Sequence, residues 1–166
     1  MNSIKKLFEN QKEQPKTKKL THLILCIYSL LSFLAVSFIK LYVRRQNFEL
    51  SITLDYLQGT LPNFFAATGI CSLIFIYIVL LSKTDTYKRK LLYAAIFTFA
   101  GLTSWEYIQY FIGYPVDYHD ILMSFIGCII TVGFVFILRK NLNKIATKKQ
   151  AQKTSYVTAE QQLSVK

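Results

Sequence analysis

Long apolar stretches, separated by short polar segments, dominate this chain. Four such runs are present, and they cover residues 20–39, 61–82, 91–112 and 121–138. An α-helix rises about 1.5 Å per residue, so about 20 apolar residues cross a hydrocarbon core of about 30 Å. The pattern therefore predicts four transmembrane helices joined by short connections.

The composition excludes a soluble fold of this size. Apolar residues make up 52% of the 166 residues and charged residues only 17%. A chain this short cannot bury four wholly apolar helices on all sides. The predicted fold is therefore all-α, a membrane-embedded bundle of four transmembrane helices over residues 20–140. The tails, residues 1–19 and 141–166, are basic and polar, and we expect them to be disordered.

The distribution of Lys and Arg predicts the orientation of the bundle. Of 20 such residues, 17 lie in the two tails and in the loop between the second and third spans. The remaining three, Lys40, Arg44 and Arg45, follow the first span. The positive-inside rule then predicts that both termini are cytoplasmic. Because the cations border apolar runs, they argue for contact with membrane lipids and against nucleic-acid binding, despite a net charge of +11.

The sequence carries none of the familiar catalytic or cofactor motifs. It has no phosphate-binding loop, HExxH pair or dinucleotide glycine pattern, so no cofactor is predicted. The three cysteines, Cys26, Cys71 and Cys128, all lie within apolar runs. Their odd number argues against a disulfide framework, and they are interpreted as small apolar packing residues.

Polar residues gather at the end of the third span. Glu106 lies inside that span, where a carboxylate costs up to about 2.5–3.5 kcal/mol at the bilayer centre, so it is a functional-site hypothesis by default. Its neighbours three or four residues away, which share its helix face, are Thr103, Gln109 and Tyr110. This polar stripe is expected to face the interior of the bundle.

Two aspartates border the start of the fourth span. Asp117 is explained either as a turn residue or as part of a site, and Asp120 either as a helix N-terminal acid or as part of the same site. A short turn would bring both to the end of the Glu106 stripe. His119 lies between them, but the spacing matches no metal signature, so no metal is predicted. Residues expected to support this outer pocket are Arg44, Arg45 and Asn63.

The stretch from Glu106 to Gly127 resembles the VanZ-like family of small bacterial membrane proteins. Glu106 and Gln109 match the family's Glu and Gln three residues apart, and Asp117 and Asp120 match its two aspartates. Two positions differ, because Tyr114 stands where many members have Arg and Ser124 where many have Asn. The resemblance implies an envelope protein of the bacterial cytoplasmic membrane, which binds or acts on a cell-wall precursor, a lipid or an antibiotic.

Four functional interpretations follow from these observations. The leading one is a binding protein whose outer-leaflet pocket is formed by Glu106, Gln109, Tyr110, Asp117, Asp120 and Ser124. The second is an intramembrane enzyme on a lipid-linked substrate, with Glu106 as proton donor and Asp120 ionised. The third is a small transporter subunit, which the scarcity of polar residues in the other spans disfavours. In the fourth, the acids are only a structural clamp around the turn. Catalysis and oligomeric state are left open.

Overall fold

The computed structural model describes residues 16–43, 52–81 and 86–164 of the chain. Within these ranges it is all-helical, with no strand among the described residues. The elements are α2 (Lys16–Phe38), its π-helical extension η1 (Ile39–Val43), α3 (Ile52–Leu81), α4 (Tyr87–Phe111) and α5 (Tyr118–Ser164). Each of the four long helices contains a segment long and apolar enough to cross a membrane. The prediction of an all-α chain with four membrane-length helices is confirmed.

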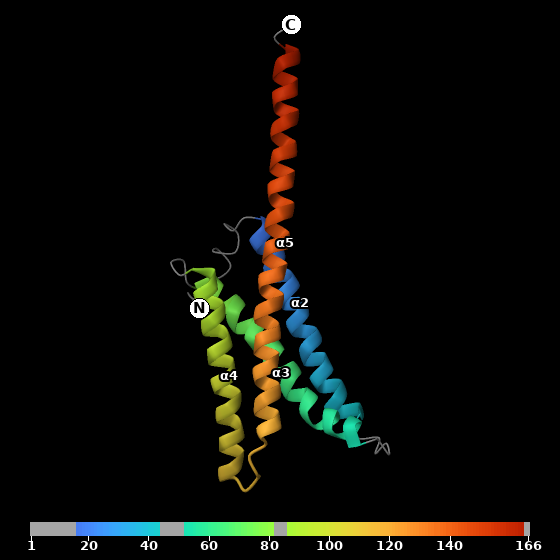
Figure 1. The fold of residues 1–166 in the computed structure, drawn as a ribbon, viewed down its shortest axis with the longest axis vertical. Helices are drawn as coiled ribbons and strands as arrows, with labels where there is room; N and C mark the ends of the chain where they lie inside the picture. Colours follow the sequence, from blue (N-terminus) through green and yellow to red (C-terminus); the bar gives the residue numbers. More distant parts are fainter. Residues whose placement is uncertain (1–15, 44–51, 82–85, 165–166) are drawn as a thin grey trace, which may run out of the picture.

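Helix α3 lies at the centre of the bundle and packs against all three other long helices. It runs obliquely between α2 on one side and the pair α4 and α5 on the other (Figure 1). Helices α4 and α5 are antiparallel neighbours joined by a short turn, which lies at the lower end in this view (Figure 1). The buried core draws Leu25 from α2, Phe75 from α3, Leu91 from α4 and Val135 from α5.

Helix α3 begins at Ile52, before the predicted second span at residue 61. Thr60 and Pro62 resemble a helix start, but Pro62 lies inside α3 and is buried. The Thr60 hydroxyl donates instead to the carbonyl of Tyr56 one turn earlier, at 3.2 Å. A proline removes only one backbone hydrogen bond from a helix. Packing of α3 against its neighbours outweighs that loss.

Helix α5 differs from the sequence prediction at its other end. The fourth span was expected to end at residue 138, with a disordered tail from 141, but the helix continues to Ser164. Residues 139–164 contain neither Gly nor Pro, and Lys, Gln and Ala, which are good helix formers, make up nearly half of them. A helix already formed in the span propagates into such a segment at little cost, because nucleation is the expensive step. The predicted N-terminal tail, 1–19, lies outside the described residues except for Lys16–Lys19, which belong to α2.

The surface and the interior of the bundle have the composition expected of a membrane protein. Large apolar residues face outward along the helices, for example Leu30, which is 60% exposed, and Phe97, which is 70% exposed. Buried positions instead hold many small polar residues, including Ser29, Thr68 and Ser72. Lipid tails are as apolar as leucine, so transmembrane helices associate through small residues and interhelical hydrogen bonds.

The contact between α2 and α3 illustrates this kind of packing. Ser29 Oγ donates across the interface to the carbonyl of Gly69 at 2.9 Å, and Thr68 Oγ1 donates to Ser32 Oγ at 2.9 Å. Gly69 has no side chain, so the Phe33 ring and the Ser32 Cβ approach to 3.2–3.3 Å from where a Cβ would be. Close backbone approach and the two hydrogen bonds therefore hold α2 against α3.

We expect Ser29→Ala to weaken this interface. The substitution removes the only side-chain oxygen of residue 29 and leaves the Gly69 carbonyl without that donor. Interhelical hydrogen bonds in membranes contribute about 0.6 kcal/mol on average and about 1.7 kcal/mol at most. A fall of this size in unfolding free energy, measured in mild detergent, is the expected result, with the exposed Ser104→Ala as matched control. Equal stability of the two variants would contradict the assigned bond.

Two of the three cysteines meet in the core. Cys71 of α3 and Cys128 of α5 are buried free thiols that interact with each other, whereas Cys26 is exposed. The interaction places the middle of α3 directly against α5. This pairing was not foreseen from the sequence, because cysteines on separate apolar runs carry no sign of which helices pack together.

Candidate functional site

The turn between α4 and α5 has a defined hydrogen-bond pattern. The carbonyl of Gln109 accepts from the backbone N–H groups of Ile112 at 3.0 Å and Tyr114 at 3.1 Å. The Gly113 N–H binds the carbonyl of Tyr110 at 3.1 Å. Gly113 has φ of 102°, which lies in the left-handed region that favours glycine. The glycine thus ends α4 and redirects the chain within a few residues.

Asp117 starts α5 as its N-terminal cap. Its Oδ1 accepts a hydrogen bond from the backbone N–H of His119 at 2.9 Å. Its backbone carbonyl accepts from the N–H of Ile121 at 3.3 Å, which begins the helical pattern. A carboxylate in this position satisfies one of the free N–H groups of the first turn. Asp120 lies in that first turn as well, where the helix dipole favours an acid.

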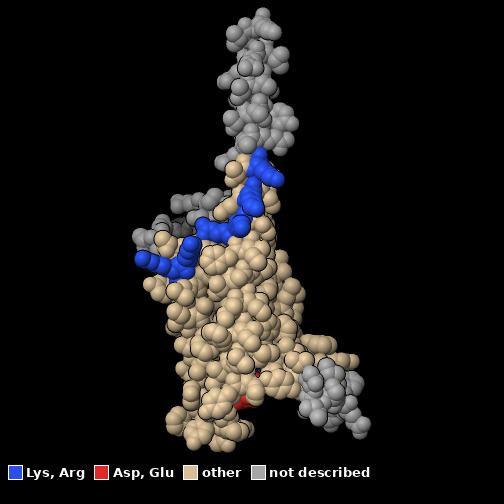
Figure 2. All heavy atoms as spheres, in the orientation of Figure 1, with Lys and Arg blue, Asp and Glu red and all other residues tan. Residues whose placement is uncertain are grey.

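Glu106 connects α4 to this cap. Only 7% of the residue is exposed, and its carboxyl interacts with the backbone N–H of Asp117. The carboxyls of Asp120 and Asp117 are close enough to interact electrostatically with it. The structure therefore brings together the three acids that the sequence singled out. In Figure 2, acidic atoms form only a small visible area near the lower end of the molecule, in keeping with this burial.

A contact that the sequence did not predict connects α3 to the first turn of α5, beside the three acids. The Tyr56 hydroxyl lies 3.0 Å from His119 Nδ1, a hydrogen-bonding distance. The two rings also meet edge to face, with centroids 5.2 Å apart and planes at 87°. The sequence prediction placed Tyr56 in a loop before the second span, so it gave no reason to pair the two. The extended start of α3 is what carries Tyr56 to α5.

The other predicted pocket residues occupy different environments. Ser124 is 97% buried and lies one turn after Asp120 on the same face of α5. Thr103 is half-buried, and its hydroxyl is enclosed without a hydrogen-bond partner in the described part of the chain. Gln109 is half-buried at the start of the turn. These three lie on the two helices that supply the acids.

Tyr110 and the supporting residues are placed less centrally. Tyr110 is 59% exposed and its ring contacts that of Phe111, so it belongs to the surface rather than to the buried cluster. Asn63 is half-buried in α3, two turns beyond Tyr56. Arg44 and Arg45 lie outside the described residues. Among the described residues, no group of three His, Cys, Asp or Glu side chains is arranged to hold a metal ion.

The link between Tyr56 and His119 gives a direct test of the site's geometry. We expect Tyr56→Phe to keep the edge-to-face ring contact but to lose the hydrogen bond. Because both residues are exposed, the cost in unfolding free energy should not exceed about 1 kcal/mol. The more sensitive measurement is the nitrogen chemical shift of His119 Nδ1, which should change in Tyr56→Phe and not in the control Tyr107→Phe. An unchanged shift in Tyr56→Phe would contradict the contact.

The assembled cluster is rich in hydrogen-bond acceptors. Glu106, Asp117 and Asp120 supply carboxyl oxygens, and His119 adds an imidazole at the rim. Such a group suits hydroxyl or amine donors of a bound molecule. Comparisons of the chain with family models, curated proteins and solved structures gave no match. The resemblance to the VanZ-like family therefore rests on the residues between Glu106 and Gly127 alone.

Proposed function

We propose that this protein is a VanZ-like multi-pass protein of the bacterial cytoplasmic membrane, whose acidic cluster binds a polar ligand from the outer leaflet. The ligand is a lipid, a cell-wall precursor or an antibiotic-like molecule. Both termini face the cytoplasm in this proposal. The orientation is supported by a band of Lys and Arg side chains over the start of α4 and the part of α5 beyond the bundle (Figure 2). The acidic cluster lies at the opposite end of the bundle.

The burial of Glu106 carries the proposal. Glu106, with only 7% of the residue exposed, lies beside two further carboxyls and repels them when all three are ionised. Capping of α5 requires only Asp117, so neither Glu106 nor Asp120 is needed as the cap. A ligand that brings positive charge or several hydrogen-bond donors would offset this repulsion. Polar residues at membrane depth mark functional sites for the same reason.

The arrangement also suggests the part of the ligand that is recognised. The described side chains of the cluster offer acceptors, and the apolar surfaces of α4 and α5 continue from them towards the middle of the bundle. A molecule with an amine or hydroxyl headgroup and an apolar tail satisfies both surfaces. Amphipathic molecules of the outer leaflet have this construction.

Native mass spectrometry of the protein purified gently with its own lipids tests the proposal. The wild type is expected to carry a specific adduct whose mass identifies its chemical class. Glu106→Gln and Asp120→Asn are expected to lose that adduct, and the exposed Ser104→Ala is expected to keep it. Identical adducts in all four proteins would refute the site.

An intramembrane enzyme is the second proposal, and one observation favours it. Glu106 is buried, whereas Asp120 is half-buried in the first turn of α5, where the helix dipole favours its ionised form, and such unequal environments allow two acids to divide the roles of proton donor and proton acceptor. Conversion of a labelled lipid-linked substrate by the pure protein, lost in Glu106→Gln, would establish catalysis. Retention of an adduct without any conversion would favour the binding protein.

A further inference from the structure

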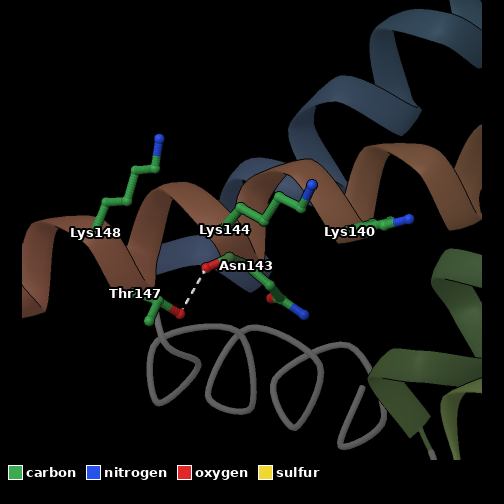
Figure 3. A pocket seen from close by; sticks show the side chains of 5 residues that line it. All are labelled: Lys140, Asn143, Lys144, Thr147 and Lys148. Carbon is green, nitrogen blue, oxygen red and sulfur yellow. Dashed lines mark hydrogen bonds between the residues drawn. The ribbon is translucent and has the colours of Figure 1, made fainter.

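The part of α5 that extends beyond the bundle carries an open groove lined by Lys, Asn and Thr side chains, to which the proposed function assigns no ligand. Its lining residues are Lys140, Asn143, Lys144, Thr147 and Lys148. They follow one another along a single stretch of the helix (Figure 3). At 3.6 residues per turn, these positions fall within an arc of about 140° on one face of α5. The opposite face carries Leu142 and Ala146, both half-buried.

We propose that this groove is a binding site for the phosphate group of an anionic phospholipid. The first argument is its chemistry. Three exposed ammonium groups line it, together with the amide of Asn143. The Thr147 hydroxyl donates to the backbone carbonyl of Asn143 at 3.1 Å, as the dashed line in Figure 3 shows. Its proton is therefore engaged, and the donors for an anion are the three lysines and the amide.

The second argument is the level of the groove in the membrane. The apolar run of α5 ends at Leu138, so by helical rise Lys140 and Lys144 lie about 3 and 9 Å beyond it. The headgroup layer extends about 5–7 Å beyond the hydrocarbon core on each side. Lys148 lies about 15 Å beyond Leu138, and its long side chain reaches back towards that layer. The helix is continuous from the span, which fixes the lysines at this level.

The neighbouring Arg139 shows that not every cation at this end is available to lipid. Its guanidinium lies 3.6 Å from the centre of the Tyr87 ring, and Tyr87 itself packs edge to face on Phe75. Arg139 is accordingly half-buried and connects α5 to α4. The three lysines of the groove, in contrast, are exposed. Because Arg139 is engaged with Tyr87, the exposed cations at this end of the described part of α5 are Lys140, Lys144 and Lys148.

The test compares two triple variants with equal loss of charge. Lys140→Gln/Lys144→Gln/Lys148→Gln removes the cations of the groove, and Lys19→Gln/Lys88→Gln/Arg89→Gln removes three exposed cations of α2 and α4. Each purified protein is titrated with phosphatidylglycerol and with phosphatidylcholine of the same acyl chains. Native mass spectrometry then measures occupancy by the first added lipid. This design is independent of membrane orientation and of the acidic cluster.

The wild type is expected to bind phosphatidylglycerol more tightly than phosphatidylcholine. A basic residue near an anionic surface contributes about fivefold in affinity, so the groove variant should lose at least fivefold of the preference. The control variant should keep it. Equal losses in both variants would overturn the proposal, because total charge alone would then explain the preference. Displacement of the lipid by inorganic phosphate, and not by chloride of equal ionic strength, would also overturn it, by showing a site for the free anion.

Discussion

Replacing Glu106 by glutamine is expected to remove the bound ligand while the fold stays intact. Glutamine has nearly the same shape, and its carbonyl oxygen can still accept from the Asp117 N–H. It lacks the charge that strengthens a hydrogen bond to a donor on the ligand. Hydrogen bonds to charged groups contribute about 1.5–3 kcal/mol, so affinity should fall by about 10- to 100-fold. The fraction of molecules with a co-purified adduct, measured by native mass spectrometry, is the readout.

Stability measurements on the same protein separate a ligand site from a structural clamp. Glu106 interacts electrostatically with Asp117 and Asp120, so loss of its charge relieves repulsion. Glu106→Gln should therefore melt at the same temperature as the wild type or slightly above it. Glu106→Ala also removes the acceptor for the Asp117 N–H, and should lower the unfolding free energy by about 1–3 kcal/mol.

The two variants together allow a clear decision. A protein with Gln at position 106 that is stable but carries no adduct identifies Glu106 as a ligand-binding residue. If that variant keeps the adduct while Glu106→Ala unfolds, the carboxyl serves only to hold the turn against α4. The interaction with the Asp117 N–H makes this second outcome a concrete alternative, because it already gives Glu106 a structural partner.

The sequence predicted the helices and the acidic cluster for simple physical reasons. Apolar runs of about 20 residues have few alternatives to a membrane helix. A turn as short as Ile112–Asp117 leaves α5 no course except back along α4, which brings Asp117 and Asp120 to Glu106. The local sequence was therefore enough to predict contacts between residues that lie close together along the chain.

Contacts between distant segments were not predictable in this way. The pairing of Tyr56 with His119 depends on how far α3 extends before Pro62, which packing decides rather than local propensity. The meeting of Cys71 and Cys128 depends on the register between α3 and α5. The extension of α5 to Ser164 did not follow from the polar composition of residues 141–166, which is as typical of a disordered tail as of a helix continued from the span.

The register between α3 and α5 depends on Gly127. Replacement of Gly127 by a larger residue is expected to lower the unfolding free energy more than the other proposed substitutions. A Cβ at residue 127 would lie 2.7 Å from the carbonyl oxygen of Phe64 and 2.9 Å from the Cβ of Ala67. The obstructing atoms are backbone and Cβ, which cannot rotate aside. Gly127→Ala therefore forces the helices apart, at a cost of about 1–3 kcal/mol, and Gly127→Val should cost more.

A matched glycine on the same helix isolates this effect. Gly133 has no atom within 4 Å of its Cβ position, so Gly133→Ala should only gain helix propensity, about 1 kcal/mol at most. Thermal unfolding in mild detergent is expected to place Gly127→Ala below the wild type and Gly133→Ala at or above it. If both variants behave alike, the close approach of α3 and α5 is incorrect.

The same substitution links the packing of the bundle to the acidic cluster. Helix α5 carries both Gly127 and His119, and α3 carries both Phe64 and Tyr56. Separation of the two helices at Gly127 should therefore lengthen the contact between Tyr56 and His119, about two turns away along α5. We expect Gly127→Ala to change the His119 Nδ1 shift in the same direction as Tyr56→Phe. Gly127 would then act by setting how closely the helices that carry the acidic cluster approach each other.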